Sequence, residues 1–154
     1  MLEIKQAFSE ESYKLIKEIF IEYANYLAID LDFQNFDEEL KNIQGNYSPP
    51  EGCILLAYFE GKIAGCVAVR KLQDDICEMK RLYVRPNYQN KTIGKELSKA
   101  IIQKAKEIGY KYMRLDTLPF MKAALKIYAS LGFKEIAPYR YNPIEGAKYF
   151  ELKL

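Results

Sequence analysis

The residues between 89 and 95 combine features that suit the binding of a phosphate group. They read Gln-Asn-Lys-Thr-Ile-Gly-Lys and precede a run of apolar residues at helical spacing. The first turn of a helix has unpaired N–H groups and a partial positive charge, so it attracts anions. Gly94 would let a ligand approach the backbone, and Lys91 and Lys95 add charge. An ordinary helix start, with Thr92 as the N-cap and solvated lysines, explains the same residues.

The composition limits the chemistry that the rest of the chain can perform. The sequence contains no histidine, which excludes Ser–His and Cys–His nucleophilic pairs and most zinc sites, so we expect no metal. The three cysteines, Cys53, Cys66 and Cys77, are odd in number and lie in apolar strand-like contexts. They are expected to be reduced core residues of a cytoplasmic protein, and a reactive thiol is the alternative.

A strand and a long helix must position the 89–95 segment. Residues 76–84 contain Met79, Leu82, Tyr83 and Val84 with charged residues between them and stop at a Pro-Asn pair, which indicates a strand. From Ile93 to Ile108 the apolar residues recur at helical spacing, and Gly109 is typical of a helix end. The segment therefore lies in the turn between this strand and the N-terminus of this helix.

The amino-acid sequences of two stretches resemble motifs of the GNAT superfamily of N-acyltransferases. The strand Leu82-Tyr83-Val84-Arg85-Pro86, followed by Gln89-Asn90-Lys91-Thr92-Ile93-Gly94, resembles its motif A, with Thr92 in place of the first motif glycine. The run from Ala124 to Phe133, which contains Tyr128 and ends in Leu-Gly-Phe, resembles its motif B. Met121 stands where an asparagine often precedes the tyrosine. The two motifs occur in the expected order.

The resemblance implies transfer of an acetyl group from acetyl-CoA to a primary amine of a small molecule, by direct attack in a ternary complex. The backbone of the strand would bind the pantetheine arm, and the N–H groups of the turn would hold the pyrophosphate. The implied cofactor-binding residues are Leu82, Tyr83, Val84, Gln89, Asn90, Lys91, Thr92, Ile93, Gly94 and Lys95. A non-catalytic module that binds or senses acyl-CoA is the alternative function.

Two side chains are candidates for proton transfer. The resemblance implies that Tyr128 is the general acid that protonates the departing thiolate; an ordinary core tyrosine on an apolar helical stripe is the alternative. Glu78 matches a strand position that carries a catalytic glutamate in some relatives, so it is the candidate general base. A surface glutamate paired with Lys80 or Arg81 is the alternative for Glu78.

The resemblance implies that the 139–143 loop and the acidic segment 30–39 border the acceptor pocket. Aromatic walls with carboxylates favour a cationic amine, whereas Arg140 would suit the carboxylate of an amino acid. The first 60 residues are acidic and the remainder is basic, which supports a cationic substrate and a phosphorylated cofactor on different sides. Nucleic acid binding is not expected, because the lysine-rich helix lacks interleaved aromatic residues.

The length of 154 residues suits a single domain over 1–154, present as a monomer or homodimer. No apolar run of membrane length or signal peptide is recognised, so no membrane partner is expected. The patterns predict an α/β fold: a mixed, mostly antiparallel sheet of about seven strands with a central parallel pair, and about four helices. Gly45 to Gly52 is expected to break the chain, and Pro119 is expected to begin a helix whose inner face includes Phe120.

Overall fold

The computed structural model describes residues 1–27, 36–89 and 91–154. Among these residues the chain forms seven strands and five α-helices, joined by a 3-10 turn at Pro86–Tyr88. The strands are β1 (Leu2–Gln6), β2 (Cys53–Phe59), β3 (Lys62–Gln73), β4 (Ile76–Val84), β5 (Tyr112–Thr117), β6 (Lys134–Ile136) and β7 (Lys148–Lys153). The helices are α1 (Glu10–Leu27), α2 (Phe36–Lys41), α3 (Ile43–Tyr47), α4 (Ile93–Ile108) and α5 (Lys122–Ser130).

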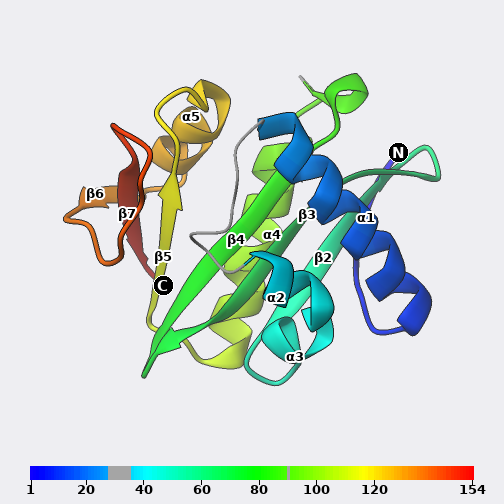
Figure 1. Cartoon of the computed structure of the whole chain (residues 1–154), viewed down its shortest axis with the longest axis horizontal. Coiled ribbons are helices and arrows are strands. Elements are labelled where there is room, and N and C mark those ends of the chain that lie inside the picture. The colour runs from blue at the N-terminus through cyan, green and yellow to red at the C-terminus, as the bar shows by residue number, and fades with distance from the viewer. Residues whose placement is uncertain (28–35, 90) are drawn as a thin grey trace.

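The strands form one twisted sheet in the order β1-β2-β3-β4-β5-β7-β6. Every described pair is antiparallel except β4 with β5, which α4 connects as a crossover. The predicted mixed sheet with a central parallel pair is therefore confirmed. Figure 1 shows α4 behind the strands and α1, α2 and α3 on the opposite face.

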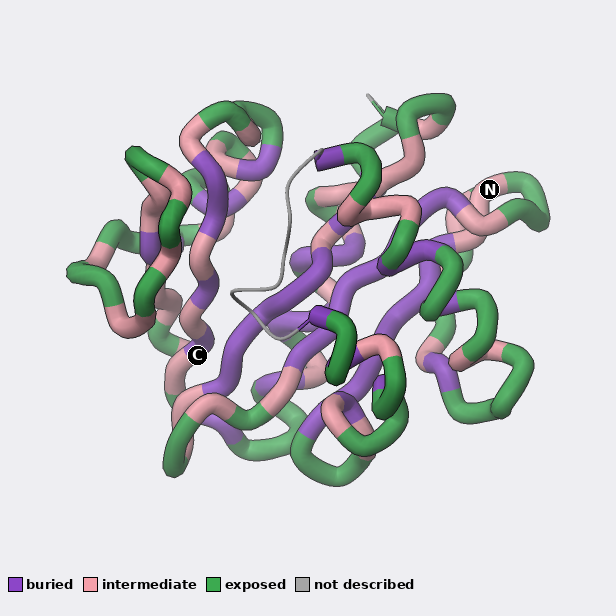
Figure 2. Tube along the Cα trace, in the orientation of Figure 1, coloured by how far each residue is buried: buried purple, intermediate pink, exposed green. Residues whose placement is uncertain are grey.

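Two apolar layers hold the sheet between the helices. One layer joins α4 and α5 to the sheet and includes Leu97, Ile101 and Met113, and the other joins α1, α2 and α3 to the opposite face and includes Phe20. The central strands are buried along most of their length (Figure 2). Because helices cover both faces of the middle strands, the sequences of these strands are nearly uninterrupted runs of apolar residues.

A bulge interrupts β4 at Arg81. Between Cys66 and Ala68 of β3 the register shifts, so that one extra residue of β4 is accommodated. Arg81 takes a left-handed backbone conformation with φ of 60°, which residues with a Cβ adopt only rarely. Its buried guanidinium makes two hydrogen bonds to Glu39 of α2, of 2.8 and 2.9 Å. This ion pair ties the bulge to the helical layer.

The parallel pair β4–β5 is short. Its register covers only Ile76 to Glu78 on β4 and Tyr112 to Arg114 on β5. Beyond this point the two strands diverge toward their carboxyl ends, as Figure 1 shows. The carboxyl ends of strands in an open α/β sheet are common places for ligands. The bulge and the divergence therefore leave the β5-facing edge of β4 unpaired by β5 from Met79 onward.

Two expectations about helices are wrong in detail. Gly45 does not break the chain, because the side chain of Asn42 caps α3 and accepts a hydrogen bond from the Gly45 N–H at 3.1 Å. The short helix α3 thus extends into the segment expected to break the chain, and the structure has five α-helices where about four were expected. Pro119 does not begin α5, since residues 118–121 form a turn and the helix begins at Lys122. Phe120 is consequently exposed instead of facing the core.

Candidate active site

The turn that enters α4 is shaped by Thr92. Its backbone is left-handed, with φ of 60° and ψ of 9°, the conformation that glycine adopts at least cost. Its hydroxyl donates a hydrogen bond to the carbonyl of Lys91 at 2.6 Å and does not cap the helix. Thr92 is thus the N-cap residue, as the alternative expected, but its side chain does not cap the helix. The Thr92 hydroxyl therefore does not bond to the first-turn N–H groups of α4.

The other described residues of this turn are divided between the core and the surface. Ile93 is buried, whereas Lys91 and Lys95 are exposed, with the Lys91 ammonium 5.1 Å from the centre of the Phe59 ring. A Cβ on Gly94 would lie 3.1 Å from the side chain of Ile127 in α5. The small size of Gly94 therefore serves the packing of α4 against α5. Asn90, also predicted to bind the cofactor, lies outside the described residues.

The end of β4 has side chains that point to different layers. Leu82 and Val84 pack on the α4 side of the sheet, while Tyr83 packs on the α1 side and donates a hydrogen bond to Glu22 at 2.8 Å. The carbonyl of Val84 accepts a hydrogen bond from the Gln89 side chain at 3.2 Å. That carbonyl, predicted to bind a cofactor, thus already holds the turn against the strand.

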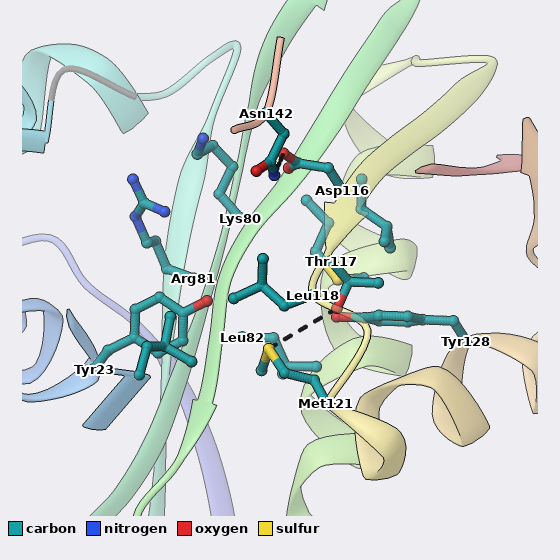
Figure 3. Close-up of a pocket in the computed structure, with 13 residues that line it drawn as sticks. Tyr23, Lys80, Arg81, Leu82, Asp116, Thr117, Leu118, Met121, Tyr128 and Asn142 are labelled. Carbon is teal, nitrogen blue, oxygen red and sulfur yellow. Dashed lines mark hydrogen bonds between the residues drawn. The ribbon is translucent and has the colours of Figure 1, made fainter. Parts of the chain in front are cut away.

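A pocket opens where β4 and β5 diverge (Figure 3). Residues from α1, β4, β5, α5 and the β6–β7 loop line it. They are Tyr23, Leu27, Met79, Lys80, Arg81, Leu82, Leu115, Asp116, Thr117, Leu118, Met121, Tyr128 and Asn142. Leu82 and Tyr128, predicted from two separate motifs, meet in this pocket. Its lining combines apolar walls with a few polar groups, as in most small-molecule sites.

Tyr128 projects from α5 toward the divergence of the strands, with its hydroxyl directed into the pocket (Figure 3). Its ring packs 5.6 Å from the ring of Phe133 and 6.3 Å from that of Phe150, measured between centroids. No hydrogen bond joins its hydroxyl to another described residue. Burial raises the pKa of Tyr128 above its ordinary value, so the phenol remains protonated at neutral pH. Tyr128 is therefore a core side chain whose protonated hydroxyl faces the pocket.

Glu78 is fully buried and does not line the pocket. Its carboxylate pairs with Arg70 at 3.2 Å, with Lys80 at 4.0 Å and with Arg140, and it accepts a hydrogen bond from the Tyr139 hydroxyl at 2.8 Å. Burial acts to raise the pKa of this carboxyl, but the surrounding cations and the hydroxyl outweigh it, so the pKa lies below its ordinary value. The alternative of a surface glutamate is wrong, although the predicted pairing with Lys80 is present.

Sequence reasoning did not identify several polar groups of the pocket. Lys80 is buried there, and burial with the neighbouring Arg81 lowers its pKa to about 7. Asp116 accepts a hydrogen bond of 3.4 Å from Asn142, within the 139–143 loop expected to border the acceptor. The alternation of β5 could have placed Asp116 on the face opposite Leu115. Nothing in the sequence marks where β5 leaves β4.

The fold and the pocket together define a class of enzyme. A mixed sheet whose one parallel pair diverges beside a helix N-terminus, with a tyrosine facing the divergence, is the architecture of acyl-CoA-dependent N-acyltransferases. The model of the Acetyltransferase (GNAT) family matches residues 10–133. The chain belongs to this family and is an acyltransferase.

Relatives and solved structures agree with this assignment. An uncharacterized N-acetyltransferase of Schizosaccharomyces pombe is 44% identical over 135 residues, which cover 86% of this chain and 83% of the relative. The N-acetylaspartate synthetase of Xenopus tropicalis is 33% identical over 110 residues, 70% of this chain but only 41% of the relative.

A GNAT-family acetyltransferase of Staphylococcus aureus Mu50 has the same fold, with a TM-score of 0.81, 23% identity and 99% coverage of both chains. An acetyltransferase of Salmonella typhimurium, solved with acetyl-CoA, has a TM-score of 0.72 and 19% identity, covering 99% of this chain and 93% of the other. None of the described helices is both long and apolar enough to cross a membrane.

Proposed function

We propose that this protein transfers an acetyl group from acetyl-CoA to the primary amine of a small molecule, by direct attack in a ternary complex. The observation that carries the proposal is the pocket between the diverging ends of β4 and β5, which Leu82 and Tyr128 both line. Residues of two separate motifs thus face one space beside the N-terminus of α4. The two substrates bound there would gain the rate advantage of proximity.

The residues present fit acetyl-CoA. From Met79 onward the edge of β4 that faces β5 is not paired with β5, so its backbone groups suit the amides of an extended pantetheine arm. The first turn of α4, with Lys91 and Lys95 exposed beside it, suits the pyrophosphate. Leu82, Tyr83, Val84 and the turn residues are therefore proposed to bind acetyl-CoA through backbone groups, apart from the Val84 carbonyl, which Gln89 occupies.

Acetyl-CoA supplies an acetyl thioester, whose carbonyl carbon bonds to the amine nitrogen as its carbon–sulfur bond breaks, giving an amide, a thiol and one released proton. Tyr128 is the proposed general acid, because its protonated hydroxyl points into the pocket. It gives its proton to the departing sulfur and regains one from the amine nitrogen. The chain thus needs no nucleophile of its own.

The general base predicted at Glu78 stays a prediction. Its carboxylate lies outside the pocket lining and is held by three cations and a hydroxyl. A proton from the acceptor would reach it only through an intervening group such as Lys80, which lines the pocket 4.0 Å from Glu78.

Amino acids are the acceptors that we would test first. The pocket has basic groups on its β4 side, Lys80 and Arg81, and the carboxylate of Asp116 on its β5 side (Figure 3). The ammonium group of an amino acid would find the opposite charge at Asp116. The relatives named N-acetylaspartate synthetase point to the same class of acceptor. The monomeric or homodimeric state is part of the proposal.

A thermal shift and a turnover assay test the function together. Acetyl-CoA is expected to raise the melting temperature, and free thiol should appear when amino acids, polyamines or aminoglycosides are added. Stabilisation without thiol release for any amine would instead support the alternative of an acyl-CoA-binding module. Absence of both effects would contradict the proposed function.

Replacing Tyr128 with phenylalanine tests the general acid. The loss of its proton is expected to lower kcat about 100-fold, the lower range for general acid catalysis, while stabilisation by acetyl-CoA is retained. Because the pKa of Tyr128 is raised, wild-type kcat should show no loss from this group between pH 6 and about 9. Tyr58→Phe, on β2 and outside the pocket lining, is the matched control. A Tyr128→Phe enzyme with unchanged kcat would refute this role.

A further inference from the structure

The acceptor side of the pocket contains one carboxylate whose role the motifs do not assign. Asp116 is the only acidic side chain among the described residues that line the pocket. Glu78, by comparison, is fully buried beneath Tyr139 and Arg140 and lies outside the lining. An ammonium group that entered the pocket would therefore meet Asp116 directly.

The geometry of β5 places Asp116 and Tyr128 on opposite sides of the sheet. Along β5 the buried residues are Met113, Leu115 and Thr117, which alternate with the half-buried Asp116. Met113 and Leu115 belong to the core layer that includes Tyr128, so Asp116 points to the opposite face. A thioester between β4 and β5 would thus have the Tyr128 hydroxyl on one side and the Asp116 carboxylate on the other.

Asp116 is held in a defined position. Its carboxylate accepts a hydrogen bond from the Nδ2 atom of Asn142 at 3.4 Å. The other end of that amide is fixed, because the Oδ1 atom of Asn142 accepts a hydrogen bond of 2.9 Å from the N–H of Ile144. One oxygen of Asp116 is therefore oriented by the β6–β7 loop. The second oxygen can receive a ligand, since a carboxylate accepts several hydrogen bonds.

The cluster around Glu78 explains how that loop is anchored. The Tyr139 ring lies 5.6 Å from the Arg114 guanidinium and 5.2 Å from that of Arg140. Its hydroxyl donates to Glu78, and the Tyr149 hydroxyl donates to the Arg140 carbonyl at 2.9 Å. These contacts dock the start of the loop on β4 and β5, three residues before Asn142. Glu78 thus acts on the pocket through the loop.

We propose that Asp116 is the catalytic residue that binds the ammonium group of the acceptor and takes its first proton. This inference rests on the proposed function and names the group that activates its acceptor. The carboxylate becomes a carboxylic acid as the ammonium becomes a neutral amine, and the proton then leaves to solvent. The second proton of the nitrogen goes to the Tyr128 oxygen after Tyr128 has protonated the sulfur. Glu78 is a positioning residue in this scheme.

The test compares Asp116→Asn with Glu78→Gln, two changes of a carboxylate into an amide of the same shape. At pH 7.5, with the best amino acid acceptor, Asp116→Asn should lower kcat/KM at least 100-fold. The loss should shrink as the pH approaches the pKa of the amine, because the neutral amine then exists without the enzyme's help. Glu78→Gln should change the acceptor KM more than kcat, without this pH-dependent recovery.

Equilibrium binding supplies a readout apart from turnover. Calorimetric titration of the acceptor into the enzyme with CoA should show weaker binding for Asp116→Asn, with unchanged melting temperature and CoA affinity. Asp116→Glu, which keeps the carboxylate, should retain the wild-type pH profile, and Glu135→Gln on the exposed strand β6 is the surface control.

Activity of Asp116→Asn within threefold of wild type at pH 7.5 would overturn the inference, as would a loss equal at every pH. Either result leaves the proposed function standing if the wild type still releases thiol with an amine. A wild-type protein that turns over no amine would overturn both.

Discussion

The left-handed conformation of Thr92 has a measurable cost. A residue with a Cβ in this region is disfavoured by about 1–2 kcal/mol, and glycine would remove that strain at an entropic cost of about 0.5–1 kcal/mol in the unfolded chain. Thr92→Gly is therefore expected to stabilise the free protein by up to about 1 kcal/mol, or about 2–4 °C in melting temperature. Thermal unfolding of the free protein measures this change.

The same substitution should strengthen acetyl-CoA binding, because it removes a side chain from the turn at the N-terminus of α4. The additional stabilisation by acetyl-CoA should then be larger for Thr92→Gly than for wild type at equal ligand concentration. Lys91→Gly, next to the turn residue, controls for glycine flexibility alone. Equal stabilisation of wild type and Thr92→Gly would show that the turn does not approach the nucleotide.

At the residue scale, the sequence predicted the presence of Tyr128 and Leu82 at one site, because their motifs are local and specific. It did not predict Asp116, because the pocket that Asp116 lines is built from five segments: α1, β4, β5, α5 and the β6–β7 loop. The burial of Glu78 was missed for the same reason. Tyr139 and Arg140, which cover it, are 61 and 62 positions away along the chain.

The close approach of β3 to the end of β4 requires a glycine at position 65 of β3. A Cβ on Gly65 of β3 would stand far inside van der Waals contact with the carbonyl oxygen of Tyr83. Because that atom belongs to the backbone, it cannot move without separating β3 from β4. Gly65→Ala is therefore expected to destabilise the protein by about 2 kcal/mol or more, measured by urea unfolding.

Gly61→Ala is the control for this prediction. Gly61 has φ of 79° but nothing within 4 Å of an added Cβ, so its substitution costs only the conformational strain of about 1–2 kcal/mol. If the two variants lose equal stability, the close approach at Gly65 is not what holds the two strands in register. Reduced acetyl-CoA binding by Gly65→Ala would further link the packing of β3 on the end of β4 to the cofactor edge of β4.

At the element scale, strand and helix patterns predicted β4 at Ile76–Val84 and the end of α4 at Gly109. The errors occurred where a short polar interaction decided the backbone. Asn42 caps α3 through Gly45, and the turn at 118–121 delays α5 beyond Pro119. The bulge at Arg81 is tied to Glu39, which lies 42 positions away. Local sequence patterns do not contain such contacts.

At the scale of the whole molecule, the three thiols lie in both layers of the core. Cys53 and Cys77 pack on the α4 side of the sheet, whereas Cys66 packs on the α1 side. All three are buried and free, as predicted for reduced core residues. Burial raises the pKa of Cys53 to about 11 and that of Cys66 and Cys77 to about 12. The native protein thus keeps these thiols protonated and inaccessible.

The reaction of each cysteine with a thiol reagent therefore reports when the core layer around that cysteine opens. At pH 8 the reagent should react with none of the three thiols of the native protein on the time scale of seconds. It should react with all three after denaturation. Because folding raises the thiol pKa values, their stabilisation is fully present below about pH 8.5. It is lost as the pH rises through 11 to 12, the folded-state values.

Comparing the reaction rates of single cysteines shows whether the protein unfolds as one cooperative unit or as two. If the sheet and both helical layers unfold together, Cys66 and Cys77 should react at the same rate under mild denaturant, because both wait for global opening. Variants that retain one cysteine each, with Cys→Ala at the other two positions, allow the rates to be measured separately. Faster reaction of Cys66 would show that α1, α2 and α3 open alone. The Arg81–Glu39 pair, which joins α2 to the bulge, argues against this, since a helix carrying a buried carboxylate cannot leave without exposing the paired guanidinium.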